Sequence, residues 1–141
     1  VGKLGLKYVA MHKRGTPETM QSLCDYDNVT QQVIEYFRDF EKRAAQFGIF
    51  DWILDPGFGF AKRVDQNYQM LEELDQFKLL KREILIGISR KSFIYRPLGV
   101  GPEDVLELTS QLHAKAIAKG AGILRVHDVA EAVRVVKEVK N

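Results

Sequence analysis

Four short apolar runs recur along the chain, and each is followed by a polar loop and then by a segment with helical periodicity. The runs cover residues 7–12, 49–55, 84–89 and 122–127. They are rich in Ile, Val, Leu, Tyr and Trp and are too short for typical helices, so they are predicted to be strands. The whole chain therefore has the order βαβαβαβα.

The intervening segments have the three- and four-residue spacing of amphipathic helices. The first helix is expected to end at Gly48, and its apolar stripe consists of Val29, Val33, Ile34, Phe37, Phe40 and Ala44. A second helix is expected over residues 66–81. Its inward residues are expected to be Met70, Leu71, Leu74, Phe77 and Leu80.

Two further helices are expected in the last third of the chain. One covers residues 102–119 and stops at Gly120. The other begins at Asp128, because Asp128 and Glu131 have the spacing of a capping box. Its buried stripe is predicted to consist of Val129, Val133 and Val136.

Strands separated by helices are expected to be parallel, which places the chain in the α/β class. Two architectures fit, namely an open doubly wound sheet and part of a TIM (β/α)8 barrel. The 141 residues hold four units, so eight such units would span about 280 residues, which is typical of a barrel. The chain is therefore predicted to be a half-barrel, with residues 1–141 forming one domain without an internal boundary.

Composition narrows the class of protein. The chain is 45% hydrophobic and 28% charged with a net charge of +2, which excludes a disordered or collagen-like chain and argues against a nucleic-acid partner. No apolar run approaches the roughly 18–20 residues that cross a bilayer, so no membrane partner is expected. Cys24 is the only cysteine, and this predicts a reducing compartment, the cytoplasm.

Polar side chains gather where each predicted strand ends. They are His12, Lys13 and Arg14; Asp55; Ser89, Arg90, Lys91 and Ser92; and Arg125, His127 and Asp128. In parallel α/β folds ligands bind at this edge, in barrels and in open sheets alike. The sequence therefore predicts one ligand site built from four loops.

Arg125 and His127 are two residues apart on the last strand, so their side chains share one face while Leu124 and Val126 face the helices. Two such donors suit a phosphate or pyrophosphate. The alternative is a structural ion pair between Arg125 and Asp55 or Glu131.

Asp55 ends an apolar strand, so its carboxylate must find donors. A ligand with adjacent N–H groups, such as the edge of a pterin, would supply them; the alternative is that Asp55 caps the turn at Gly57–Gly59. The two glycines are half of a dinucleotide fingerprint, but Lys62 replaces the third, so a nucleotide-binding doubly wound domain is a weak alternative. Phe60 is interpreted as an aromatic wall or a core residue.

Lys91 directly follows a strand, where it could donate to a heterocyclic carbonyl or nitrogen, or remain a solvated cation. The three histidines lack metal-ligand spacing, and no metal site made of protein ligands alone is expected. His113 lies within a predicted helix and is expected to pack or to be exposed.

Taken together, four motifs resemble those of the dihydropteroate synthase family, in the family's order and over essentially the whole chain. They are Met11-His12-Lys13-Arg14-Gly15-Thr16-Pro17, Asp55-Pro56-Gly57-Phe58-Gly59-Phe60-Ala61-Lys62, Gly87-Ile88-Ser89-Arg90-Lys91-Ser92 and Arg125-Val126-His127-Asp128-Val129. Related pterin-binding methyltransferases share the barrel and an aspartate-based site, but the last two motifs favour the synthase.

The resemblance implies a folate-pathway transferase, a sulfonamide target, that joins 4-aminobenzoate to 6-hydroxymethyl-7,8-dihydropterin diphosphate and releases pyrophosphate. Asp55, Lys91, Arg125 and His127 would be its catalytic residues. The implied contacts are Met11, Asp55, Phe60, Gly87 and Lys91 for the pterin, Phe60 and Ser92 for aminobenzoate, and Arg125, Val126 and His127 for pyrophosphate. Mg²⁺ would be bound through the diphosphate and residues outside this chain, and the family is often homodimeric.

The chain resembles only the last four of the family's eight βα units, and residues 107–110 depart from the small-residue sequence expected there. The isolated chain is therefore expected to have little synthase activity. Two alternatives remain open, namely a non-catalytic half-barrel that binds pterin or phosphate and a domain similar to the pterin-dependent methyltransferases.

Overall fold

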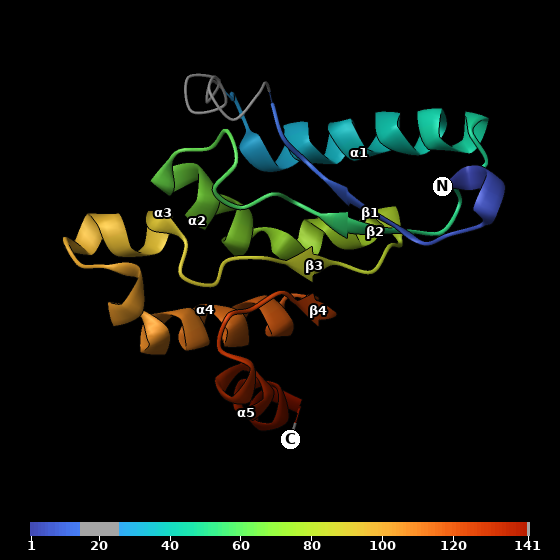
Figure 1. Ribbon diagram of the computed structural model, residues 1–141. Coiled ribbons are helices and arrows are strands. Elements are labelled where there is room, and N and C mark those ends of the chain that lie inside the picture. The colour runs from blue at the N-terminus through green and yellow to red at the C-terminus, as the bar shows by residue number, and fades with distance from the viewer. Residues whose placement is uncertain (15–25, 141) are drawn as a thin grey trace.

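Four parallel strands form the centre of the molecule (Figure 1). In a computed structural model that describes residues 1–14 and 26–140, the strands are β1 (Tyr8–Met11), β2 (Trp52–Asp55), β3 (Leu85–Ile86) and β4 (Ile123–Leu124). β1 pairs with β2 and β3 with β4, and a parallel bridge between Leu54 and Ile84 joins the two pairs. The predicted strand number and parallel order are confirmed, but each strand is shorter than its apolar run. β2 lacks residues at the start of its run and keeps Asp55 in the ladder, whereas β3 and β4 end before the polar residues of theirs.

The helices lie between the strands, as the periodicity predicts. They are α1 (Val29–Gln46), α2 (Val64–Glu72), α3 (Ser92–Tyr95), α4 (Leu106–Ala118) and α5 (Val129–Lys140), with 3₁₀ turns η1 (Gly2–Leu4), η3 (Leu74–Leu80), η4 (Arg96–Leu98) and η5 (Pro102–Asp104). The first part of the motif that begins at Met11 is visible, whereas Gly15–Pro17 and Cys24 lie outside the described residues.

Two of the expected helices are each broken in two. The segment 66–81 is α2 followed by η3, because a 3₁₀ helix keeps residues three apart on one side and so holds Leu74 and Phe77 in the core with Leu80 packed beside them. The segment 102–119 is η5 followed by α4. The break falls at Val105, whose backbone is not helical and whose side chain is buried.

α1 covers the outer face of β1 and β2 with the predicted stripe. Asn28 caps the helix by accepting a hydrogen bond from the Gln31 amide at 3.2 Å. Phe37 stacks on Trp52 of β2 with ring centroids 5.9 Å apart, and Phe40 stacks on Tyr8 of β1. The buried members of the stripe are Val29, Val33, Ile34, Phe37 and Ala44.

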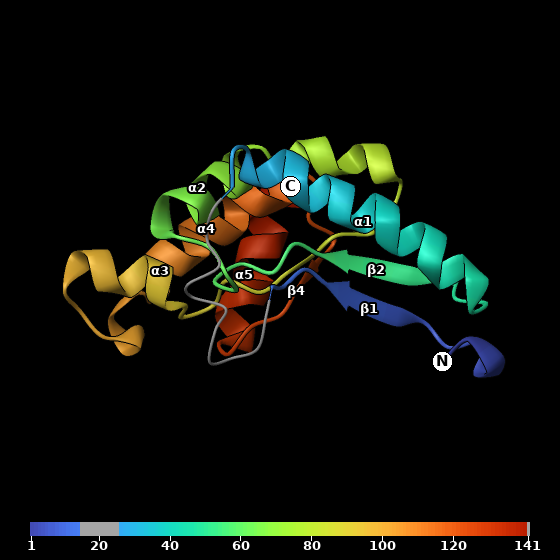
Figure 2. The ribbon, with the colours of Figure 1, turned by 90° about the horizontal axis from the view of Figure 1, so that it is seen from above.

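The helices cover one face of the strands. Figure 2 shows α1, α2 and α4 on the same side of the strand layer. On the opposite face Val9 of β1 is 44% exposed. A doubly wound sheet carries helices on both faces, so this one-sided cover is the arrangement of a barrel wall.

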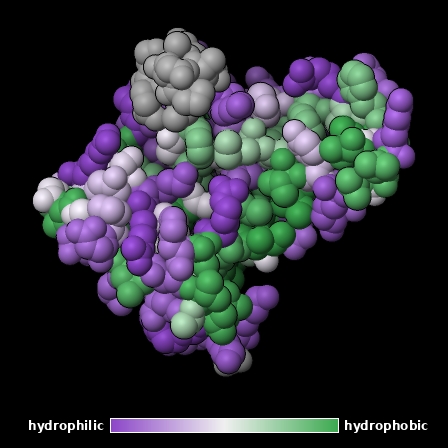
Figure 3. Space-filling view, in the orientation of Figure 1, coloured by the Kyte–Doolittle hydropathy of each residue, from purple (hydrophilic) through white to green (hydrophobic). Residues whose placement is uncertain are grey.

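The apolar stripe predicted for α5 is wrong. Val129 and Val133 are exposed, and the residues that α5 buries are Ala132 and Val135. The valines line an open groove of about 360 Å³ together with Leu124 and Val126, and Figure 3 shows hydrophobic surface in this lower part of the molecule. Among the described residues, no segment packs over this side of α5. In residues 1–14 and 26–140 no helix combines the length and the apolar character needed to cross a membrane.

Candidate functional site

Asp55, the last residue of β2, is 1% exposed. One carboxylate oxygen, Oδ1, accepts a hydrogen bond from the Gly57 amide at 2.9 Å. The other, Oδ2, lies 3.2 Å from Nη2 of Arg125 but in a geometry that makes no hydrogen bond. Both structural alternatives, the turn cap and the ion pair with Arg125, are thus confirmed, and they leave one buried oxygen with unused acceptor capacity.

Electrostatics at this carboxylate favour a ligand that donates hydrogen bonds. Burial raises the pKa of Asp55, while the Gly57 amide and the positive charges of Arg125 and Lys91 act in the opposite direction. Because burial has the larger effect, the ionised carboxylate is undersolvated in this structure. Adjacent N–H groups of a bound heterocycle would supply the missing stabilisation.

Lys91 and Phe60 form the wall beside Asp55. The Lys91 ammonium lies 4.4 Å from the centroid of the Phe60 ring, a cation–π distance. Burial and the nearby Arg125 lower the pKa of Lys91, and Asp55 partly offsets this effect. Phe60 is half-buried and lies outside the core cluster, and Lys91 is partly desolvated rather than a fully solvated surface cation.

Gly87 provides space for Arg125. A Cβ atom at Gly87 would lie 2.5 Å from Nη2 of Arg125, so the guanidinium rests directly on the backbone at Gly87. The Arg125 amide donates to the Ile86 carbonyl at 2.9 Å, which fixes the start of this loop against β3. The Arg125 side chain is 52% exposed, so it can exchange its contact with Asp55 for a contact with an anion.

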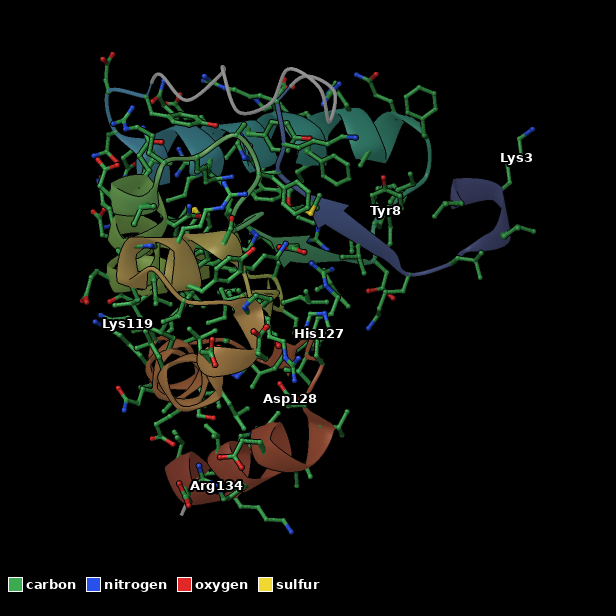
Figure 4. The ribbon with its side chains drawn as sticks, turned by 60° about the vertical axis from the view of Figure 1, so that its left-hand side comes forward. Lys3, Tyr8, Lys119, His127, Asp128 and Arg134 are labelled. Atoms are coloured by element: carbon green, nitrogen blue, oxygen red, sulfur yellow. The ribbon has the colours of Figure 1, made fainter. Side chains whose placement is uncertain are left out.

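The loop after β4 is tied to the loop after β3 by side chains. Ser89 Oγ accepts a hydrogen bond from the His127 amide at 3.2 Å and lies 3.0 Å from His127 Nδ1. The Arg90 guanidinium binds both oxygens of Asp128, at 3.0 and 2.5 Å. Figure 4 shows His127 and Asp128 in the connection from β4 to α5. These ties orient His127 and lower the pKa of Asp128.

The remaining predicted residues take different positions. Met11 pairs with Asp55 in the β1–β2 register. Ser92 begins α3 and lines a pocket of about 280 Å³ with Gly59 and Arg96. The Val126 side chain lies in the groove beside α5, as its strand parity predicts, so only its backbone is available to an anion.

The sequence places His12 at the predicted ligand edge and Lys62 in the second motif, but it does not predict that the two side chains are buried together. Lys62 and His12 are each 3% exposed, with Lys62 Nζ 2.9 Å from His12 Nδ1. In the sequence Lys62 appears as the residue that replaces the third glycine of the dinucleotide fingerprint and as the last residue of the second motif, and no role is predicted for it. His113, expected to pack or to be exposed, is buried in α4, and burial lowers its pKa.

A family model described as pterin binding enzyme matches residues 1–127. The chain is 41% identical over 138 residues to the dihydropteroate synthase of Escherichia coli K12, covering 96% of this chain and 49% of that enzyme. It is 39% identical over 132 residues to the Synechocystis dihydropteroate synthase, with 92% and 46% covered. The chain therefore spans about half the length of the curated relatives it matches.

Solved structures agree with this pattern. The Yersinia pestis dihydropteroate synthase, solved as a complex with a sulfonamide drug, superposes with a TM-score of 0.95 at 35% identity, covering 99% of this chain and 51% of that one. The Thermus thermophilus dihydropteroate synthase gives a TM-score of 0.92 at 32% identity, with 99% and 56% covered.

Proposed function

Because the chain belongs to the family of pterin-binding enzymes, we propose that it supplies the pterin- and diphosphate-binding half of a dihydropteroate synthase. The observation that carries the proposal is the Asp55 carboxylate, which is 1% exposed and has one oxygen without a hydrogen bond beside Arg125. A buried acceptor of this kind fits a heterocycle with paired N–H donors.

The pterin would lie in the space between Asp55 and Lys91, which we call the pterin slot. Asp55 accepts hydrogen bonds from the pterin's 2-amino and N3 groups, and Lys91 donates to a ring carbonyl or nitrogen. Phe60 forms an aromatic wall, and the Lys91 ammonium above its ring defines the depth of the slot. Met11 and Gly87 line the inner side, where the absence of a side chain at Gly87 leaves room for Arg125.

The reaction would begin when the C–O bond between the exocyclic methylene and the diphosphate breaks, and the electron pair leaves with pyrophosphate. The amine nitrogen of 4-aminobenzoate then bonds to the resulting pterin-stabilised cation and loses a proton. Arg125 and His127 would stabilise the negative charge on the leaving group. The half-exposed Arg125 can reach it, and Ser89 holds His127 in place.

The second substrate would enter from the side of α3. Ser92 and Phe60 lie at this side of the site, where a pocket of about 280 Å³ is lined by Gly59, Ser92 and Arg96. The guanidinium of Arg96 suits the carboxylate of 4-aminobenzoate. The amine at the other end of that molecule would then face the pterin methylene, and such positioning contributes much of the rate.

The family resemblance implies Mg²⁺, and the described part of the chain can be tested for side chains that would bind it. Within residues 1–14 and 26–140 no group of three or more His, Cys, Asp or Glu side chains could hold a metal ion. Both oxygens of Asp55 face groups in the protein, one the Gly57 amide and the other Arg125. We therefore assign the ion no ligand among the described residues, and the steps proposed above rest on side chains of this chain.

The unit that completes the enzyme would be four further βα units, so that residues 1–141 form the second half of an eight-unit barrel. The complete enzyme would be a homodimer and would lie in the cytoplasm. A non-catalytic binding module and a methyltransferase-like domain are the alternatives, and the same experiment separates them.

A chimera tests the proposed function. The half of the Escherichia coli dihydropteroate synthase that matches this chain is replaced by residues 1–141, and pyrophosphate release is measured with the pterin diphosphate and 4-aminobenzoate. We expect turnover that Asp55→Asn reduces by about 100-fold or more, because an amide cannot accept two N–H donors as a carboxylate does. Asp51→Asn, an exposed carboxylate at the start of the same segment, should keep its activity.

Pterin binding without pyrophosphate release would leave only a binding module. Transfer of a methyl group from a methylated pterin to an added thiol acceptor would favour the methyltransferase alternative. A chimera that is folded but binds no pterin would contradict the proposal.

A further inference from the structure

Lys62 is a buried lysine with three defined partners. Its side chain is 3% exposed. The ammonium donates to the carbonyl of Gly57 at 2.8 Å and to that of Phe60 at 2.9 Å, and it lies 2.9 Å from Nδ1 of His12. The three protons of an ammonium thus have three acceptors, two in the loop after β2 and one in the loop after β1.

Burial and the neighbouring positive charges determine the protonation state of His12. Burial is the main reason that its pKa falls to about 3, and the charges of Lys62 and Arg14 lower it further. His12 is therefore neutral near pH 7. Because an ammonium only donates, Nδ1 of His12 must accept, and the ring proton must be on Nε2. The ring itself packs edge-on against Tyr36, with centroids 4.8 Å apart.

The two carbonyls that Lys62 binds belong to residues that build the site. The Gly57 amide donates to Asp55 Oδ1, and the Phe60 ring lies under the Lys91 ammonium. Lys62 thus reaches both walls of the pterin slot through the backbone without lying in the slot. The anion end of the site, at Arg125 and His127, has no described contact with Lys62.

We propose that Lys62 is a positioning residue for the pterin half of the site. By binding the carbonyls of Gly57 and Phe60 it fixes the backbone of Gly57, whose amide orients Asp55, and the backbone of Phe60, which places the aromatic wall. This inference rests on the proposed function, because it concerns the same pterin slot. It goes further by assigning a role to a residue that contacts neither substrate. Loss of Lys62 should therefore weaken pterin binding selectively and leave anion binding unchanged.

The test uses the full chain and two separate probes. Binding of 6-hydroxymethylpterin, which carries no diphosphate, reports the Asp55 end, and binding of inorganic pyrophosphate reports the Arg125 end. We expect Lys62→Met to weaken pterin binding by about tenfold or more and to change pyrophosphate binding by less than twofold. Lys62→Arg, which keeps a donating cation, should recover part of the lost affinity.

A spectroscopic signature separates positioning from a general loss of stability. In Lys62→Met the Gly57 carbonyl loses its donor, so residue 57 can turn and its amide bond to Asp55 weakens. Carbon-detected NMR should then show the pKa of Asp55 rising further. Leu112→Ala, a core truncation in α4, is the matched control for stability. It should leave the Asp55 carboxyl and the ratio of the two affinities unchanged.

The outcomes are distinct. If the unchanged chain binds pterin neither alone nor in the chimera, the proposed function fails and this inference fails with it. If it binds pterin and Lys62→Met binds equally well, or loses pterin and pyrophosphate affinity alike, only the inference fails. Should Lys62→Met not fold, nitrogen NMR of the unchanged chain decides: a proton on His12 Nδ1 would overturn the cluster, and a proton on Nε2 with protected Lys62 ammonium protons would support it.

Discussion

The two ends of the site are built differently. At the end of β2 and in the loop that follows it, Asp55, Phe58 and Lys62 are all at most 3% exposed. Asp55 and Lys62 both bind backbone groups of this loop, and Lys62 also contacts His12. In the loop after β4, Arg125 and His127 are exposed and are held mainly by contacts with the loop after β3. Under the proposed function, the flat heterocycle is bound by partners in fixed positions, whereas the diphosphate is bound by charged side chains that can move with it. The difference suggests that the first end is preorganised and the second adapts.

The largest effect should come from closing the space in the preorganised loop. A Cβ at Gly57 would lie 2.1 Å from the His12 carbonyl oxygen, and Gly57 has φ +76°. Neither backbone can yield without breaking the Lys62 cluster, so we expect Gly57→Ala to cost on the order of 3 kcal/mol in the free energy of unfolding. Urea-induced unfolding of the unchanged chain and of Gly57→Ala measures this difference in the free energy of unfolding.

Gly99 provides the matched control for Gly57. It has a similar φ of +67°, but a Cβ there meets nothing within 4 Å. Gly99→Ala should therefore show only the strain of the left-handed backbone, about 1 kcal/mol. Equal costs at the two glycines would mean that the contact between the loops after β1 and β2 is not tight.

The pH dependence of stability tests the burial of Asp55. Burial raises its pKa above the ordinary 3.8, so the folded chain holds this proton more tightly than the unfolded chain. Stability carried by Asp55 is therefore greatest below about pH 3.8 and falls as the pH rises through its raised pKa. The free energy of unfolding of the unchanged chain, minus that of Asp55→Asn, should decrease over this window.

The comparison with Asp55→Asn removes the contribution of the other carboxylates. Ion pairs lower the pKa of Asp65, Asp128 and Glu131, so their stabilisation is lost in the opposite direction, as the pH falls. Asp51→Asn controls for the loss of one negative charge at an exposed position. A difference curve for Asp55 that rises with pH would contradict a raised pKa.

The sequence predicts the frame of this molecule well because the frame depends on local patterns. Alternating apolar runs and helical stripes identify the four parallel strands, and strand parity correctly sends Val126 toward the helices. The position of Asp55 at the end of an apolar strand predicts a partly buried carboxylate, and the structure buries it further, to 1% exposed.

What the sequence could not predict depends on contacts between distant residues. Lys62 is 50 residues from His12, so no local pattern links them, and a lysine after a glycine loop resembles a solvated cation. The valines of α5 have a helical stripe that predicts burial, yet Val129 and Val133 are exposed, because burial depends on whether another segment packs against the stripe. Periodicity predicts which face of a helix is apolar, but it does not predict which segment, if any, packs against that face.

At the adaptable end, Arg125→Met should have an intermediate effect. A charge-assisted contact with phosphate oxygens is lost, so pyrophosphate affinity should fall by about tenfold, while pterin affinity changes less. Arg134→Met is the control, since Arg134 lies on α5 away from His127 (Figure 4) and pairs with Glu131 and Glu138. Isothermal titration with pyrophosphate measures both variants, and an equal loss in the two would indicate only a nonspecific effect of net charge.

The smallest effect should appear where the adaptable loop is held by one hydroxyl. Ser89 is 4% exposed, and its Oγ lies within 3.2 Å of both the His127 amide and the ring nitrogen Nδ1. Ser89→Ala frees the His127 ring without removing it, so pyrophosphate affinity should fall by about threefold and pterin affinity should not change. Ser110→Ala, another buried serine, lies on α4 and contacts Glu131; it should leave both affinities unchanged. If Ser89→Ala weakened pterin binding as much as pyrophosphate binding, the two ends of the site would form one rigid unit, and the contrast between them would not hold.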